Sequence, residues 1–189
     1  MEATATQLTR PQAGTAAVVR LAAEDMAEQH QYLTFLLGDE MFAIGILSIR
    51  EIIEYGFVTN VPMTPPFIRG VLNLRGAVVP VVDLAVRFGR QARENTKRSC
   101  IVIVEIESAN GSQAMGVVVD AVSEVLEIPG SEIEPPPEFG ARIRNDFIKG
   151  MGKIDGKFVV VLDLNLVMSI DELAVVGNLG RTVGPTARA

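Results

Sequence analysis

The side chains that could carry out chemistry are few and lie far apart in the chain. His30 is the only histidine and Cys100 the only cysteine, so a Ser–His or Cys–His catalytic pair would have to use that one imidazole. Cys100 stands in the apolar segment SCIVIVEI, which is typical of a buried, inert thiol and leaves no partner for a disulfide. CxxC, HxxxH and alternating acidic loops are all absent. We therefore predict that the protein has no metal site and no cofactor.

Two aspartates could form an acid–base pair, because Asp83 and Asp163 stand in the similar segments VVDL and VLDL. Each also precedes a short helical pattern, and aspartate is a preferred residue at the N-cap of a helix. A position that occurs twice in one chain is expected to be architectural. A small β-barrel enzyme that uses Asp83, Asp163 or Glu124 is therefore the less favoured alternative, and we predict that the protein is not an enzyme.

Both aspartates belong to a long internal repeat. FIRGVLNLRGAVVPVVDL (67–84) is echoed 80 residues later by FIKGMGKIDGKFVVVLDL (147–164) without a gap. Upstream, FAIGILSIREIIE (42–54) aligns with MGVVVDAVSEVLE (115–127). Two copies at this spacing indicate a duplicated β lobe rather than a solenoid, which needs three or more units.

Valine- and isoleucine-rich segments with Gly/Pro turns favour a mainly β protein built from two similar small barrels, each of about five strands, with few short helices. We predict a folded body over 31–173, with lobe 1 at about 31–90 and lobe 2 at about 99–173, between which strands could be exchanged. The N-terminal arm 1–30 and the C-terminal tail 174–189 are expected to be flexible.

Two local patterns give more specific expectations. Ile49, Ile52 and Ile53 stand at helical spacing, which predicts a single helical turn within 48–55. Pro80 cannot donate a backbone hydrogen bond, so its strand is predicted to lie at a sheet edge or to contain a bulge.

Charge and hydropathy exclude several classes of partner. The formal net charge is −6 and the sequence pI is about 4.9, without a basic block, so nucleic acid is not an expected partner. No segment approaches the ~20 apolar residues that span a bilayer, and the N-terminus lacks the pattern of a signal peptide. These features predict a soluble cytoplasmic protein without membrane insertion.

Arg75 is the residue that the repeat does not explain. The flanking glycines recur, Gly70 with Gly150 and Gly76 with Gly156, but Asp155 stands where the first copy has Arg75. A charge present in only one copy of a turn is not required by the framework. Glu51, which aligns with Glu124, is its candidate partner. An exposed pair of this kind would matter for recognition rather than for folding.

These motifs together resemble the CheW family. The resemblance rests on I-x-E-I (49–52), V-P-x-x-P-P-F-I-x-G-V-x-N-L-R-G-x-V-V-P-V-V-D-L (61–84), G-V-V-V-D-x-V-S-E-V (116–125) and V-V-V-L-D-L (159–164), and it covers about 31–173. It implies two SH3-like five-stranded barrels with a hydrophobic groove between them.

The resemblance also implies a function. CheW-like proteins are non-catalytic adaptors that couple the cytoplasmic tips of chemoreceptors to the regulatory domain of the histidine kinase CheA. By correspondence, Arg75, Glu51 and Ile49 are predicted to bind the receptor. Kinase contacts are predicted at Gly70, Val71 and Gly76. The expected protein is monomeric in isolation and cytoplasmic, and it is recruited to membrane-associated receptor arrays. An adaptor of a twitching or developmental pathway is the alternative within the same class.

Overall fold

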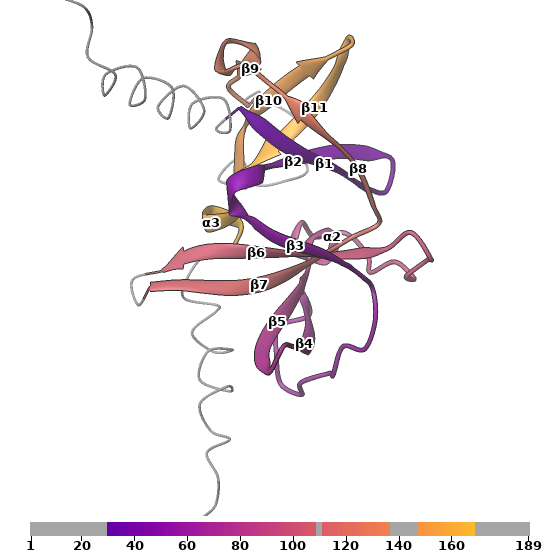
Figure 1. The fold of residues 1–189 in the computed structure, drawn as a ribbon. Helices are drawn as coiled ribbons and strands as arrows, with labels where there is room; N and C mark the ends of the chain where they lie inside the picture. Colours follow the sequence, from indigo (N-terminus) through magenta and orange to yellow (C-terminus); the bar gives the residue numbers. More distant parts are fainter. Residues whose placement is uncertain (1–29, 109–110, 137–146, 169–189) are drawn as a thin grey trace, which may run out of the picture.

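The computed structural model describes residues 30–108, 111–136 and 147–168, so the predicted tail and all of the predicted arm except His30 lie outside the described residues. Within the described part, eleven strands and four short helical segments form two lobes (Figure 1). In chain order they are β1 (Gln31–Leu37), β2 (Glu40–Gly45), η1 (Ile46–Ser48), β3 (Ile49–Glu54), β4 (Ile68–Leu74), β5 (Ala77–Asp83), α2 (Leu84–Arg87), β6 (Cys100–Ser108), β7 (Gly111–Val119), β8 (Ala121–Glu127), η2 (Gly130–Glu132), β9 (Ile133–Glu134), β10 (Ile148–Ile154), β11 (Lys157–Leu162) and α3 (Leu164–Val167).

Each lobe contains one sheet. The six-stranded lobe, uppermost in Figure 1, has the strand order β8-β1-β2-β11-β10-β9, and the five-stranded lobe has the order β3-β6-β7-β5-β4. Neighbouring strands are antiparallel except for β2–β11 and β5–β7, which are parallel and occupy equivalent places in the two sheets. This architecture confirms the predicted mainly β fold class, and the two lobes are consistent with SH3-like barrels.

The lobes do not follow the two halves of the sequence. The first copy of the repeat contains β1–β5 with α2, and the second contains β6–β11 with α3. β1 and β2 join the sheet of β8–β11, whereas β6 and β7 join the sheet of β3–β5. The two lobes therefore exchange strands reciprocally, which is the possibility left open for the lobes expected at about 31–90 and about 99–173. The chain crosses between lobes through η1 in one copy and through the single residue Asp120 in the other.

The sixth strand of the larger sheet has a counterpart in the smaller one. β9 pairs with β10 at Glu134 and Met151, and in the five-stranded lobe Thr59 forms an isolated bridge with Val71. Val71 and Met151 occupy equivalent positions of the repeat. The two lobes therefore have the same arrangement at this edge. The paired segment is a strand, β9, in the six-stranded lobe and a single bridge at Thr59 in the five-stranded lobe.

Two local expectations were wrong. Residues Ile49–Glu54 form the strand β3, paired with β6, and burial alternates along it as expected for a strand. A short apolar run cannot distinguish helix from strand, and the pairing with β6 decides here. β5 lies between β4 and β7 rather than at an edge, and the one irregularity of its pairing with β4 falls between Ile68 and Gly70, not at Pro80. Pro80 is tolerated there because its partner Val71 directs both of its backbone groups to Thr59, and the pairing with β7 begins only at Val81.

Three groups of buried side chains hold the molecule together. The largest lies between the lobes and combines residues of both sheets. It includes the fully buried side chains of Phe35, Phe42, Val104 and Met115. Two smaller groups fill the individual lobes, around Val81 in the five-stranded lobe and around the equivalent Val161 in the six-stranded lobe. Because the central cluster is the largest, the two lobes are packed as one body.

Arg87 lies where the two copies of the repeat meet. Its guanidinium carbon is 4.5 Å from the ring centroid of Phe67 and 5.2 Å from that of Phe147, which are equivalent residues of the two copies. Its Nε donates a hydrogen bond of 2.9 Å to the carbonyl of Val167, the residue that corresponds to Arg87 itself. One cation therefore joins both copies, and the second copy has an apolar residue in its place.

Candidate functional site

The strand β3 positions the first half of the candidate site. Ile49 packs against the central cluster and Ile53 against the core of the five-stranded lobe, whereas Ile52 between them is 42 % exposed. The side chain of Glu51 is 26 % exposed, on a strand that forms an edge of its sheet. The apolar residues thus fix the strand and leave Glu51 at the surface.

The β4–β5 hairpin positions the second half. Arg75 and Gly76 form its two-residue turn with φ values of +52° and +89°, as a type I′ turn requires. The Asn73 side-chain oxygen accepts a hydrogen bond of 2.8 Å from the backbone N–H of Gly76, which stabilises the turn. The Arg75 side chain, 81 % exposed, reaches Glu51 with an N–O distance of 2.9 Å. The ion pair therefore joins the hairpin tip to β3.

The second copy of the repeat repeats the backbone but not the charge. Asp155 and Gly156 have φ values of +47° and +76°, so the β10–β11 hairpin has the same kind of turn. Asp155 replaces the arginine, and Glu124 corresponds to Glu51. Two acidic side chains cannot form the ion pair of the first copy. The turn is thus architectural, and the Arg75–Glu51 pair is a property of the five-stranded lobe.

Exposed apolar side chains accompany both hairpins. Ile52 and Val78 are 42 % and 60 % exposed on the five-stranded lobe, and the equivalent residues of the other lobe, Val125 and Phe158, are 48 % and 55 % exposed. Each lobe therefore presents apolar side chains at the same two positions. We call the set Glu51, Ile52, Arg75 and Val78 the Arg75 surface.

The connection between β3 and β4 adds two fully exposed apolar side chains. Phe57 is 102 % exposed and Met63 is 99 % exposed. Met63 also has a φ of +63°, a left-handed conformation that costs a residue with a side chain roughly 1–3 kcal/mol. Large apolar side chains left in water beside a hairpin are typical of a protein-binding surface.

The predicted site residues have different surroundings. Arg75 and Glu51 are brought together, and Gly76 lies beside them in the turn. Ile49, predicted with them, packs against the central cluster. Gly70 is buried, with a φ of +141°, and a Cβ atom there would lie 2.1 Å from the Thr59 carbonyl oxygen.

That close approach gives Gly70 an architectural reason to be glycine. Val71 exchanges backbone hydrogen bonds of 2.8 Å with Thr59 in both directions. The kinase-binding roles of Gly70, Val71 and Gly76, like the receptor-binding roles of Arg75, Glu51 and Ile49, stay predictions.

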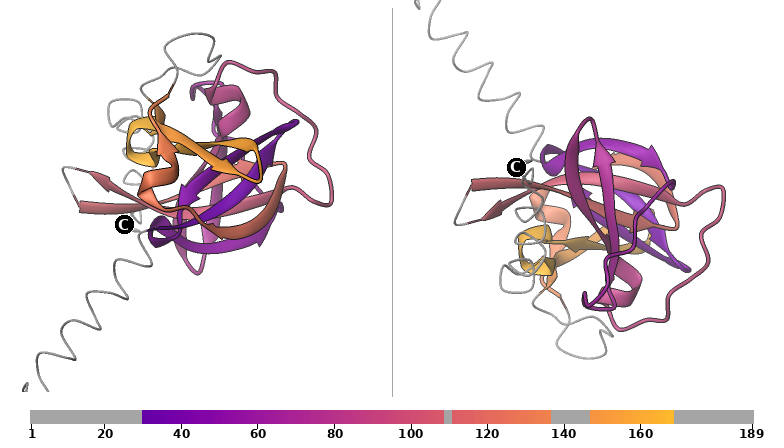
Figure 2. Two further views of the ribbon diagram at one scale, coloured as in Figure 1. Left: turned by 90° about the horizontal axis from the view of Figure 1, so that it is seen from above. Right: turned by 90° about the horizontal axis from the view of Figure 1, so that it is seen from below.

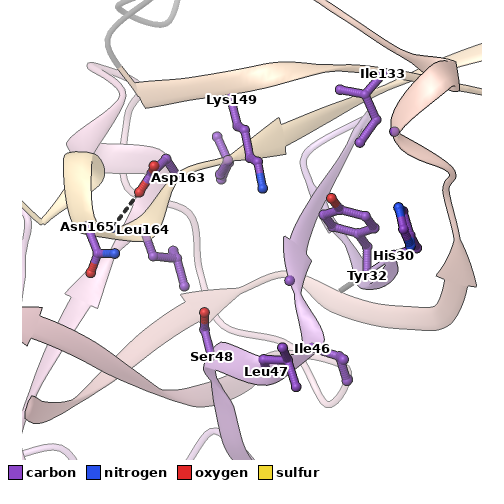
Figure 3. A pocket seen from close by; sticks show the side chains of 13 residues that line it. His30, Tyr32, Ile46, Leu47, Ser48, Ile133, Lys149, Asp163, Leu164 and Asn165 are labelled. Atoms are coloured by element: carbon purple, nitrogen blue, oxygen red, sulfur yellow. Dashed lines mark hydrogen bonds between the residues drawn. The ribbon is translucent and has the colours of Figure 1, made fainter. Parts of the chain in front are cut away.

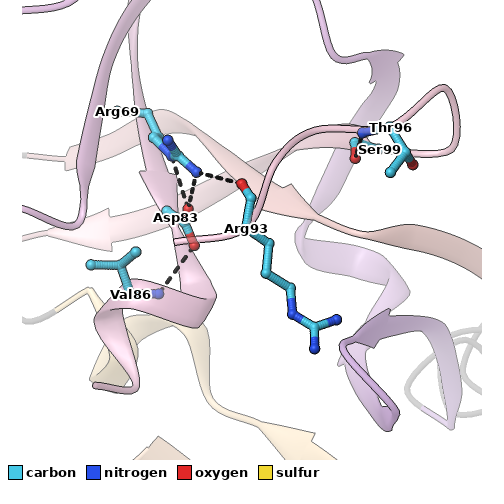
Figure 4. A network of polar contacts seen from close by, with 6 residues as sticks. All are labelled: Arg69, Asp83, Val86, Arg93, Thr96 and Ser99. Carbon is cyan, nitrogen blue, oxygen red and sulfur yellow. Dashed lines mark hydrogen bonds and ion pairs between the residues drawn. The ribbon is translucent and has the colours of Figure 1, made fainter. Parts of the chain in front are cut away.

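The carboxylates considered for catalysis have structural partners. Asp83 is buried, caps α2 by accepting from the Val86 N–H and forms an ion pair with Arg69 at 2.7 Å (Figure 4). Asp163 caps α3 by accepting from the backbone N–H groups of Asn165 and Leu166. No group of three or more metal-ligating side chains occurs among the described residues.

A cavity that the sequence did not reveal lies on the six-stranded lobe. Its volume is about 600 Å³. Figure 3 shows Lys149, from β10, projecting into it toward Tyr32. The lining comes from β1, β2, η1, η2, β9, β10, β11 and α3, and consists of His30, Tyr32, Gly45, Ile46, Leu47, Ser48, Gly130, Ile133, Lys149, Leu162, Asp163, Leu164 and Asn165. The equivalence of Lys149 with Arg69, both basic, is the sequence signal that could have pointed to this place.

Within the part of the chain that the structure describes, no helix combines the length and the apolar character needed to cross a bilayer.

Comparison with known proteins identifies the family. A family model described as a CheW-like domain matches residues 31–172. The chemotaxis protein CheW of Klebsiella aerogenes is 35 % identical over 170 residues, which is 90 % of this chain and 99 % of that protein. Protein FrzA of Myxococcus xanthus is 35 % identical over 117 residues, 62 % of this chain and 70 % of that protein.

A solved structure agrees with this result. The scaffolding protein TtCheW of Thermoanaerobacter tengcongensis has a TM-score of 0.68 and 36 % sequence identity, covering 76 % of this chain and 90 % of that protein. The family match and these relatives support an adaptor or scaffold protein. The chain belongs to the CheW family.

Proposed function

We propose that this protein couples chemoreceptor cytoplasmic tips to the histidine kinase CheA, with the Arg75 surface as part of the receptor-binding site. The observation that carries the proposal is the Arg75–Glu51 ion pair, at 2.9 Å, on a hairpin whose backbone is duplicated but whose charge is not. An exposed pair contributes only about 0–1 kcal/mol to stability, so its role is better sought in recognition.

The two lobes give the coupler two separate surfaces. The five-stranded lobe presents Arg75 with Ile52 and Val78, and the six-stranded lobe presents Val125 and Phe158 without that arginine. An amphipathic receptor helix could contact exposed apolar side chains, and the charged pair would set its register. Each interface is expected to bury roughly 1,000–1,600 Å² and to gain strength by repetition in an array.

The principal experiment measures binding of the full chain to a receptor cytoplasmic fragment and to CheA from the same genome. Arg75→Ala is expected to weaken receptor binding about tenfold, or ~1.4 kcal/mol. Asp155→Ala, at the equivalent turn, is the matched control and should leave receptor binding unchanged. Failure of the unaltered protein to bind either partner would defeat the coupling function. Equal effects of the two substitutions would remove only the assignment of the Arg75 surface.

The pathway is a separate question, because FrzA, which has a similar sequence, is not named as a chemotaxis protein. The second candidate function is therefore an adaptor of a non-flagellar chemosensory pathway, such as twitching or development. Deletion of the gene, followed by swimming and surface-motility assays, distinguishes the two: loss of swimming chemotaxis alone supports the first proposal, and loss of surface behaviour alone supports the second.

The proposed function also implies a location. The protein should be cytoplasmic and recruited to membrane-associated receptor arrays. A fluorescent fusion is expected to form clusters in cells that contain the receptors and to become diffuse when the receptors are deleted. Diffuse fluorescence in both strains would contradict recruitment.

A further inference from the structure

Arg69 and Lys149 are equivalent residues of the repeat, but their surroundings in the two lobes differ. In the five-stranded lobe, Arg69 donates to Asp83 at 2.8 Å from its Nε, and its second nitrogen donates to the Arg93 carbonyl oxygen at 3.3 Å. Figure 4 shows the segment that contains Arg93 passing directly beside this pair. The basic side chain is thus satisfied by a carboxylate and by the backbone of the linker between α2 and β6.

That linker stays against the lobe until β6 begins. The Arg93 guanidinium lies 3.7 Å from Asp120, and Thr96 and Ser99 form a hydrogen-bonded turn immediately before Cys100. Figure 2 shows the linker running along the outside of the molecule from α2 to β6. Residues that precede the first strand of the second copy therefore cover the Arg69 position.

The equivalent position of the six-stranded lobe lacks such a cover among the described residues. Lys149 is exposed, and none of the ion pairs between described residues includes it. It borders the cavity of about 600 Å³ together with Leu47, an apolar side chain that is 61 % exposed (Figure 3). The cavity thus offers the ammonium group of Lys149 and several apolar side chains, together with the carboxylate of Asp163.

We propose that residues 24–29 of this same chain, EDMAEQ, occupy the cavity and that a carboxylate of this segment pairs with Lys149. The register supports this occupant: Tyr32 and Ile101 are equivalent, so the residues before β1 correspond to the linker before β6. His30, the first described residue, lines the cavity, so the segment starts at its rim.

The chemistry of the segment matches that of the cavity. Glu24, Asp25 and Glu28 are acidic, which suits Lys149, and Met26 can pack against Leu47. Reach is not limiting, because six residues span up to about 20 Å when extended. This inference does not depend on the proposed function.

Carbodiimide cross-linking of the full chain tests the pair directly, because the reagent joins an amine and a carboxylate in contact by an amide bond. The monomer is isolated after reaction, digested and analysed by tandem mass spectrometry. We expect a link from Lys149 to Glu24, Asp25 or Glu28. Lys149→Arg keeps the charge but removes the reactive amine, so this link should be lost in that variant.

Other outcomes overturn the proposal. A link from Lys149 to Asp171 or Glu172 would identify the C-terminal segment as the occupant. A link to Asp163 alone would show that Lys149 serves its neighbour in the lobe. The absence of any link from Lys149 would likewise reject the contact.

An independent measurement uses amide chemical shifts. The variant E24Q/D25N/E28Q should shift the signals of cavity residues, including Ser48 and Lys149, whereas E2Q, a matched change elsewhere in the same arm, should not. Shifts confined to residues next to the substitutions in sequence would contradict docking in the cavity.

Discussion

The two copies of the repeat share a backbone and differ in charge. Arg75 and Asp155 both occupy left-handed turn positions followed by glycine, but only Arg75 reaches an acidic partner, Glu51 on β3. Asp83 and Asp163 both cap short helices, but of these two only Asp83 forms an ion pair with another described residue. At the hairpin tips, the turn that is present twice therefore maintains the fold, whereas the positive charge of Arg75, present once, is the better candidate for a specific contact.

The largest expected difference between the copies concerns Gly70 and Gly150. Gly70→Ala combines a φ of +141° with a Cβ 2.1 Å from a backbone oxygen, and should lower the free energy of unfolding by about 3–4 kcal/mol. Gly150→Ala meets an Ile133 methyl at 2.4 Å and the Glu134 carbonyl oxygen at 2.8 Å, but Gly150 lacks the left-handed φ of Gly70, so the substitution should cost about 1–3 kcal/mol. Chemical denaturation of both variants measures the difference, and equal losses would contradict it.

The next difference concerns the capping aspartates. Asparagine keeps the cap, so Asp83→Asn chiefly removes the ion pair with Arg69 and should destabilise by about 2–3 kcal/mol, less than a fully buried pair because Arg69 is partly exposed. Asp163→Asn should change stability by less than about 0.5 kcal/mol. Urea midpoints of the two variants test this, and a loss at Asp163 as large as that at Asp83 would mean that it too has a charged partner.

Arg87 tests the junction between the copies. Arg87→Met keeps the apolar stem but removes the contacts with Phe67, Phe147 and the Val167 carbonyl, and should cost about 1–2 kcal/mol. Arg50→Met is the control, because its pair with Glu105, at 3.8 Å, is exposed on both sides. Thermal unfolding should separate the two variants, and similar melting temperatures would refute the bridging role.

The smallest effect on stability is expected at the hairpin tips. Arg75→Ala should change the free energy of unfolding by less than about 1 kcal/mol, because its ion pair is exposed. Asp155→Ala should be equally mild. A large fall in the melting temperature of Arg75→Ala alone would indicate that the pair supports the fold rather than recognition.

Much of the fold could be predicted because the repeat itself is visible in the sequence. Alignment of the copies located the two turns, the two capping aspartates and the pairing of Glu51 with Arg75 as candidates. The exchange of strands could not be read in the same way, because the apolar pattern of β1 or β6 gives no information about which sheet receives it. The strand β3 was misread since its isoleucines satisfy both helical and extended patterns.

The candidate site could be predicted from the sequence only where the two copies of the repeat differ. Arg75 was identified by the contrast with Asp155, whereas the cavity beside Lys149 depends on how η1, α3 and β10 pack together. The role of Arg87 also depends on packing, because Phe67 and Phe147 lie 80 residues apart and meet the same guanidinium only in the folded molecule.

The reciprocal placement of β1–β2 and β6–β7 has a consequence for the integrity of the protein. Neither copy of the repeat can complete a sheet by itself, so a chain cut within the linker at 91–98 would yield two fragments that each need the other to fold. The molecule should therefore melt in one cooperative step. A gene that lost either copy would encode a chain in which neither sheet is complete, rather than a smaller adaptor.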